Sequence, residues 1–443
     1  MSRGCATRRV LRVDRPDGKK RFAAILAWLF VALAAASAFP GPSGAQSLLV
    51  PMDLTQTNHL KAYGLAFHAL QSGQVVHWLL NYRGGSFLMP AGRELILEAR
   101  LKGVSFQEVS GSDVALIYAE IERENMETVV LEKTPRIAVY TPPNKQPWDD
   151  AVTLALTYAD IPFDKVFDEE VLAGVLPRYD WLHLHHEDFS GQYGKFYGAY
   201  RLADWYRQEQ MESEALAKKL GFAKVSDAKR AVAEKIKEYV LNGGFLFAMC
   251  SACDTIDIAL AASGVDIVPA EFDYDGITPG FQDKLDYDRC FAFDGFRIIS
   301  NPLVYEFSNI DTSDYAKARG PDVDYFNLFE FSAKYDPVPT MLTQNHVNIV
   351  KGFLGQTTGF RKNLVKKSVV VLGEDPAHTE VKYIHGNLGR GTFTFLGGHD
   401  PEDYQHAIGD PPTDLALHIS SPGYRLILNN VLFPAAEKKK LKT

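Results

Sequence analysis

The sequence has few cysteines and, beyond residue 45, no long apolar run. Only four of the 443 residues are cysteine, and a chain of this length buries enough surface to fold without disulfides. No stretch after residue 45 approaches the roughly 20 apolar residues that span a bilayer. The chain also lacks a Gly-x-x-x-x-Gly-Lys-Ser/Thr phosphate loop. These absences argue against a disulfide scaffold, a multi-span membrane protein and a P-loop nucleotide enzyme.

Residues 1–45 have the layout of a secretory signal. A basic stretch precedes the apolar run "FAAILAWLFVALAAASAF" (residues 22–39), and small residues end at Ala38 and Ala45. This order of basic, apolar and small residues predicts a signal peptide that is cleaved after Ala38 or Ala45. The protein is then periplasmic or secreted. A retained membrane anchor is the alternative.

The remaining chain is acidic. Residues 1–45 hold eight of the 47 Lys and Arg residues and two of the 55 Asp and Glu residues, so the rest has a formal net charge of −14. That balance argues against nucleic acid or an anionic membrane surface as a partner. We expect a small-molecule, peptide or saccharide ligand, and we expect no cofactor and no metal. The sequence does not indicate an oligomeric state.

Strand-like apolar runs alternate with helical patterns, which predicts an α/β fold with a largely parallel sheet flanked by helices. We assign residues 46–133 to a smaller N-terminal α/β unit and 134–434 to the main domain, followed by a basic tail at 435–443. Residues 265–345 are rich in Asp, Tyr, Phe and Pro and predict an irregular insertion. "VKYIH" and "TFTFLGG" (residues 381–385 and 392–398) flank glycines as in a hairpin.

A Cys-Ser-Ala-Cys stretch follows the predicted strand "FLFAM" (residues 245–249) and begins a helical pattern. Cys250 therefore lies where a strand meets a helix N-terminus, whose amides and dipole stabilise a thiolate. Ala248 and Ala252 leave room for the tight turn of a nucleophile elbow. The alternative is a buried cysteine that only packs.

A histidine follows a second predicted strand late in the chain. His399 comes after Gly397 and Gly398, so its ring is expected at the carboxyl edge of the sheet, where α/β folds place their ligands. A nearby carboxylate can orient such a ring and favour its protonated form. The candidates for this role are Asp400, Glu402 and Asp403.

This order of strand, cysteine, helix, late strand, histidine and carboxylate resembles the class I glutamine amidotransferase-like fold over residues 134–434, with a flavodoxin-like core. The resemblance implies Cys250 as nucleophile, His399 as base and Glu402 as the orienting acid. It also implies that "EDFSGQYG" (residues 187–194), with Ser190 and Gly191, forms the oxyanion loop. The family's Gly-x-Cys-x-Gly-x-Gln is here "AMCSACD". We therefore expect hydrolysis or acyl transfer on a C–N or related bond, and not glutamine hydrolysis.

Three stretches extend the resemblance to exported bacterial proteins labelled asparagine synthetase B. They are "LLVPMDLTQTNHLKAYGLAF", "VVHWLLNYRGGSF" and "WLHLHHEDFSGQYGKFY". Neither predicted cleavage site leaves an N-terminal cysteine, and the chain has no Ser-Gly-Gly-x-Asp-Ser loop. The chemistry of that label is therefore not expected here.

Four alternatives stay open. Cys250 and Cys253 have the spacing of a redox dithiol. "HLHHED" (residues 183–188) contains the metal-ligand types His183, His185, His186 and Glu187, and His399 with Asp400 can approach it in space. Polar residues after the first predicted strand suggest a binding cleft at Asp53, Asn58 and His59, although Asn58 also suits a helix cap. A non-catalytic, exported ligand-binding protein on the same fold is the alternative to an enzyme.

Overall fold

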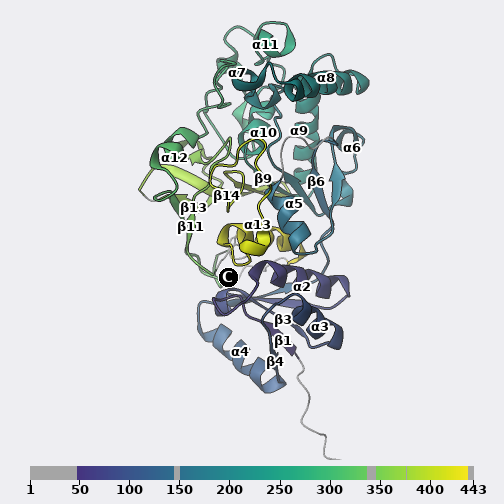
Figure 1. The fold of residues 1–443 in the computed structure, drawn as a ribbon, viewed down its shortest axis with the longest axis vertical. Helices are drawn as coiled ribbons and strands as arrows, with labels where there is room; N and C mark the ends of the chain where they lie inside the picture. The colour runs from purple at the N-terminus through teal and green to yellow at the C-terminus, as the bar shows by residue number, and fades with distance from the viewer. Residues whose placement is uncertain (1–46, 144–149, 337–345, 376, 438–443) are drawn as a thin grey trace, which may run out of the picture.

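The computed structural model describes residues 47–143, 150–336, 346–375 and 377–437, which form two sheets with helices around them (Figure 1). The predicted signal segment and most of the basic tail lie outside these residues. Within the described parts, none of the helices combines the length and the apolar character that a membrane span requires.

The N-terminal unit is built on five strands in the order β4-β1-β3-β2-β5, and every neighbouring pair is antiparallel. Asn58 caps the most buried helix of this unit by accepting a hydrogen bond from the Lys61 amide, as its residue type favours. The elements are β1 (Ser47–Val50), α2 (His59–Gln71), β2 (Val76–Leu80), β3 (Ser86–Pro90), α3 (Arg93–Leu101), β4 (Gln107–Val109), α4 (Gly111–Arg123) and β5 (Glu127–Leu131).

Half of the larger sheet is parallel, in the order β7-β6-β8-β9-β15. These strands are β6 (Ile137–Tyr140), β7 (Asp164–Val166), β8 (Trp181–Leu184), β9 (Phe245–Met249) and β15 (Gly391–Leu396). Every residue of β6, β8 and β9 is buried. Continuous apolar runs of this kind suit strands that helices cover on both faces.

The other half of this sheet is antiparallel, so the prediction of a largely parallel sheet is wrong for it. The hairpin predicted before residue 398 is confirmed, because β14 and β15 pair antiparallel across a turn at residues 389–390. So short a connection permits only antiparallel pairing. The strands of this half are β10 (Tyr325–Leu328), β11 (Ile349–Lys351), β12 (Phe360–Arg361), β13 (Val370–Asp375) and β14 (Glu380–Leu388), and β10 comes from the predicted irregular insertion.

Helices cover both faces of the larger sheet (Figure 1). On one face, α5 (Ala151–Tyr158) and α13 (Pro422–Leu432) pack with α2, so a single apolar core continues into the N-terminal unit. On the other face lie α6 (Asp168–Leu172), α9 (Val225–Leu241) and α10 (Ala252–Ala261), with α8 (Asp204–Lys219) against α9. The chain is a mixed α/β protein whose parallel strands are enclosed and end at a common edge.

Candidate functional site

Three neighbouring parallel strands, β8, β9 and β15, end at the same edge of the sheet. His185 follows β8, Cys250 follows β9 and His399 follows β15. Two hydrogen bonds join these segments: the Cys250 amide donates to the Gly398 carbonyl at 3.1 Å, and the Ala252 amide donates to the His185 carbonyl at 3.0 Å. The tertiary structure thus places the cysteine and histidine segments, far apart in the sequence, side by side.

Cys250 has a strained backbone at the junction of β9 and α10. Its φ is 53°, in the left-handed region that costs a residue with a side chain roughly 1–2 kcal/mol. The sulfur lies inside, with the residue only 3% exposed, and accepts a hydrogen bond from the Gln356 amide at 3.3 Å. Burial raises the pKa of the Cys250 thiol to about 11, although neighbouring backbone amides act to lower it. The thiol is therefore protonated near neutral pH.

The loop that reaches the sulfur, residues 355–358, was not singled out from the sequence. Its position is set by buried side chains: Thr357 donates through Oγ1 to Asp254 at 2.9 Å, and the Thr358 amide donates to Asp311 at 3.2 Å. Burial raises the pKa of Asp254 to about 7. The turn-forming composition of "GQTTG" (residues 355–359) was the only local signal of this loop.

The predicted oxyanion loop is organised around Asp188. This carboxylate accepts hydrogen bonds from the amides of Ser190 at 2.7 Å, Gln192 at 2.7 Å and Gly194 at 3.1 Å. The hydrogen bonds of these three amides to Asp188 therefore stabilise the loop itself. Gly191 has φ 81°, and a Cβ there would lie 2.7 Å from Ser226 Cα, so the glycine permits a close approach to α9. A backbone amide that donates a hydrogen bond to the Cys250 sulfur comes instead from Gln356.

The predicted orienting acid contacts a different histidine. Glu402 Oε2 lies 2.9 Å from His418 Nδ1. His399 instead stacks on His406, with ring centroids 4.7 Å apart, and His406 pairs with Asp403 at 2.8 Å. Asp400 accepts hydrogen bonds from Thr413 and Tyr424 at 2.7 and 2.8 Å and so organises the segment that follows His399.

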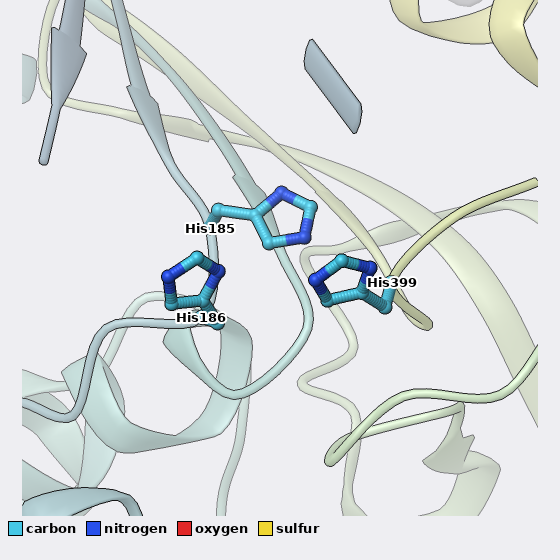
Figure 2. Close-up of side chains that lie close together, drawn as sticks. All are labelled: His185, His186 and His399. Carbon is cyan, nitrogen blue, oxygen red and sulfur yellow. The ribbon is translucent and has the colours of Figure 1, made fainter. Parts of the chain in front are cut away.

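Three imidazole rings point toward one another at this edge, with His185 and His186 on one segment and His399 across from them (Figure 2). One ring nitrogen of each histidine lies within 4.8 Å of the corresponding nitrogens of the other two. The ring centroid of His399 is 4.5 Å from that of His185 and 5.9 Å from that of His186. Neutral imidazole nitrogens in such a group are suitable ligands for a transition metal.

Asp150 lies behind His185. Its carboxylate is 3.6 Å from His185 Nδ1 and 3.2 Å from His183 Nε2, while His183 Nδ1 lies 3.1 Å from the Phe247 carbonyl. Burial lowers the pKa of His185 well below its ordinary value, so its ring is neutral. Burial acts to raise the pKa of Asp150, but the hydrogen bonds from His183 and the Thr153 amide hold it below the ordinary value, so Asp150 is an anion.

Cys253 and Cys290 are buried inside the fold, and Glu187 is half-buried. Cys250, Cys253 and Cys290 are all free thiols, so the structure holds the predicted redox pair as two separate buried groups. Cys253 Sγ donates to the Leu396 carbonyl at 3.7 Å. Burial raises the pKa of Glu187 to about 8, which leaves its carboxyl group largely protonated at neutral pH.

The predicted cleft residues in the N-terminal unit contact both that unit and the main domain, where Asn58 donates to the Tyr158 hydroxyl at 2.9 Å and His59 Nδ1 lies 3.1 Å from Ser420 Oγ. Asp53 pairs with Arg83 at 2.8 Å, and Asn58 caps α2. His59 is buried and lies 2.9 Å from the Asp53 carbonyl. The contacts found for these side chains in the described residues do not reach the edge that carries Cys250.

A cavity of about 980 Å³ lies at the opposite, amino edge of the same strands, where its lining includes Arg136, Tyr239 and Phe245. Two of its cationic side chains are already paired, because Lys133 and Arg136 both contact Asp180, at 2.7 and 3.1 Å. This cavity is therefore separate from the cysteine and histidine segments.

Comparisons with known proteins identify no family for this chain. No family model matches the chain, and no curated protein does. The cytoplasmic protein STM3548 from Salmonella typhimurium is 11% identical with a TM-score of 0.34, over 69% of this chain and 100% of that one. STM1381 from the same organism is 11% identical with a TM-score of 0.33, over 68% and 100%. A beta-galactosidase from Bacillus circulans sp. alkalophilus is 10% identical with a TM-score of 0.24, over 60% and 29%. Scores this low assign neither a fold family nor an activity.

Proposed function

We propose that the protein is an exported, cysteine-dependent hydrolase that acts on a C–N or acyl bond, with Cys250 as the nucleophile. The observation that carries the proposal is the left-handed backbone of Cys250, with φ 53° between β9 and α10. Strained backbone at a residue with a side chain persists where the surroundings enforce it, and such residues cluster at functional sites. A strained strand-to-helix turn is the geometry of a nucleophile elbow.

One hydrogen bond to the Cys250 sulfur supports the role of nucleophile. The Gln356 amide already donates to Sγ, and amides held in place in this way can also stabilise the negative charge that develops during acyl transfer. The thiol must lose its proton before it attacks, because burial raises its pKa to about 11. The assignment of His399 as base, with Glu402 behind it, stays a proposal: Glu402 pairs with His418, and the ring neighbours of His399 include His185, His186 and His406.

Trapping an acyl-enzyme tests the nucleophile. The protein is incubated with a panel of p-nitrophenyl esters and anilides, and mass spectrometry of the intact chain and its peptides locates the added acyl group. We expect acylation on Cys250 and no acylation or turnover in Cys250→Ser. The matched control is Cys253→Ser, which removes the neighbouring buried thiol. This variant should keep the acylation of Cys250 and the turnover of wild type. Turnover that persists in folded Cys250→Ser would contradict the proposal.

A ligand-binding protein without turnover is the second candidate, because Cys250 is only 3% exposed and its thiol is protonated. In that case small-molecule, peptide or saccharide ligands raise the melting temperature of the protein, while the ester and anilide panel gives neither product nor acylated chain. The export of the protein is tested separately, by N-terminal sequencing of the chain recovered from its native compartment. A mature chain that begins at Phe39 or Gln46 is the expected result.

A further inference from the structure

We propose that His185, His186 and His399 form a site for a divalent transition metal, with zinc as the best-suited ion. This site goes beyond the proposed hydrolase and uses no atom of Cys250, so it would exist whether or not the thiol reacts. It does use His399, so that ring could not act as the base of the thiol while the metal is bound. Three imidazole ligands would leave at least one coordination position for water or for an oxygen or nitrogen atom of a bound molecule.

The spacing of the three rings fits this assignment. Their ligand atoms lie within 4.8 Å of one another. Zinc binds imidazole nitrogen at about 2.0–2.1 Å, so a tetrahedral site holds its ligand nitrogens roughly 3.3–3.5 Å apart. Small side-chain rotations would bring the ligand nitrogens from their present spacing to the spacing of a zinc site, since Figure 2 shows the three rings already turned toward a common point.

His185 carries the strongest evidence for a ligand. It is 1% exposed, and neither of its ring nitrogens has a hydrogen-bond partner among the described residues. A buried polar group without a partner costs about 1–3 kcal/mol, and buried polar groups in native proteins are nearly always satisfied by protein, water or an ion. A metal bound through Nε2 would satisfy this ring.

Asp150 sets which nitrogen of His185 is available. Its Oδ1 lies 3.6 Å from His185 Nδ1, and this carboxylate is fixed because it also accepts the amides of Val152 and Thr153 at 2.7 and 3.0 Å. A carboxylate behind a metal-ligating histidine favours the tautomer with a proton on the rear nitrogen and leaves the front lone pair for the metal. Asp150 is therefore a positioning residue for this site.

A second group of potential ligands, Asp150, His183 and His185, is less suitable. Asp150 already caps α5, and His183 lies between Asp150 and the Phe247 carbonyl. The cost of removing these contacts would oppose metal binding. The group that contains His186 and His399 requires no such loss at Asp150, and it leaves that carboxylate in place to orient His185 from behind.

The backbone holds the two halves of the site in place. His399 is tied by its amide to the Leu354 carbonyl at 2.8 Å, and the preceding Gly398 has φ 92° with no room for a side chain, since a Cβ would lie 2.5 Å from the Phe353 ring. His185 is tied through its carbonyl to Ala252. Ligands on segments held this firmly suit a preformed metal site.

Metal binding is tested on the full chain without a polyhistidine tag. After treatment with EDTA and gel filtration, zinc is titrated by calorimetry, and cobalt is added as a spectroscopic probe. We expect one equivalent of zinc and the intense visible d–d absorption of four- or five-coordinate cobalt. His185→Gln and His399→Gln should each weaken binding at least 100-fold while circular dichroism shows a folded chain. Asp150→Asn should weaken it about 10- to 100-fold.

Two control variants test whether zinc binding is specific to these three histidines. His378→Gln removes an exposed histidine that pairs with Asp375 and should leave zinc binding unchanged. Cys250→Ser should also keep zinc and the cobalt spectrum, even though it abolishes acylation if the proposed hydrolase is correct. A folded chain that binds no zinc, or histidine variants that bind it as tightly as wild type, would overturn the site. A loss of binding in Cys250→Ser equal to that in His185→Gln would also overturn it.

Discussion

The amide of Cys250 donates a hydrogen bond to the carbonyl of Gly398, over 3.1 Å. This bond lies just beyond the last paired residues of the parallel ladder of β9 and β15, Met249 and Leu396. It brings the strained cysteine to the segment that ends in His399. The position of Cys250 at this edge therefore depends on the carbonyl of Gly398, a residue with a positive φ of 92°.

The need for glycine at position 398 gives a first prediction. Gly398 has φ 92°, and an added Cβ would meet the Phe353 ring at 2.5 Å and the Phe353 carbonyl at 2.7 Å. We expect Gly398→Ala to lower the free energy of unfolding through both backbone strain and overpacking, the latter adding about 1–3 kcal/mol. Urea denaturation measures the effect.

Gly409→Ala is the matched control. Gly409 has nearly the same backbone, with φ 93°, but nothing lies within 4 Å of its added Cβ. This variant should show the cost of the backbone strain alone. Equal losses of stability in Gly398→Ala and Gly409→Ala would show that crowding at the Cys250 edge is unimportant.

Asp254 gives a prediction for pH dependence. Burial raises the pKa of its carboxyl group from 3.8 to about 7, although Thr357 and Ser308 donate hydrogen bonds to it. The folded state therefore binds this proton more tightly than the unfolded state. The resulting stabilisation is complete below pH 3.8 and is lost as the pH rises through about 7, with a slope of at most about 1.4 kcal/mol per pH unit.

Asp254→Asn replaces the titrating carboxyl group with an amide. The unfolding free energy of the variant should therefore lack the pH dependence that Asp254 contributes. Relative to the variant, wild type should be most stable near pH 4 and lose its advantage progressively toward pH 7. Denaturant unfolding at several pH values measures the difference. Asp283→Asn, at an exposed position, is the control variant for the loss of a carboxyl group. A wild-type advantage that grows between pH 4 and 7 would reverse the predicted sign.

Arg425 gives a prediction for the junction between α13 and the N-terminal unit. It is fully buried, and its guanidinium donates to the Tyr63 hydroxyl at 2.8 Å and to the Met52 carbonyl at 3.0 Å. Arg425→Met would leave these groups without their donor. We expect it to lower the free energy of unfolding by about 3 kcal/mol or more, because each orphaned buried group costs about 1–3 kcal/mol.

Arg390→Met serves as the comparison for Arg425. Arg390 is exposed and donates to Asn242 at 3.2 Å, so its replacement should change the unfolding free energy by no more than about 0.5 kcal/mol. Thermal unfolding followed by circular dichroism compares the two variants with wild type. If Arg425→Met is as stable as Arg390→Met, the buried guanidinium does not secure the junction.

Local pattern was sufficient to predict several elements. The apolar run 245–249 is β9, the following helical pattern is α10, and the glycine-punctuated pair before residue 398 is a hairpin. Asn58 caps α2 as its residue type allowed. These elements depend on contacts a few residues apart, which side-chain periodicity and turn chemistry report directly.

Side-chain partners at the edge were harder to predict. Glu402 pairs with His418, and an amide that donates a hydrogen bond to the Cys250 sulfur belongs to Gln356. Each of these outcomes depends on how a loop crosses the ends of several strands. Spacing along the chain does not contain that information.

The sequence alone determined the α/β character, the strand-to-helix joint that carries Cys250 and the supply of histidines in residues 183–186 and at 399. Only the tertiary structure decided that half of the larger sheet is antiparallel and that His185, His186 and His399 face one another. The reason is physical: periodicity records which faces of an element are buried, whereas strand order and loop crossings arise from contacts between residues that are far apart in the sequence.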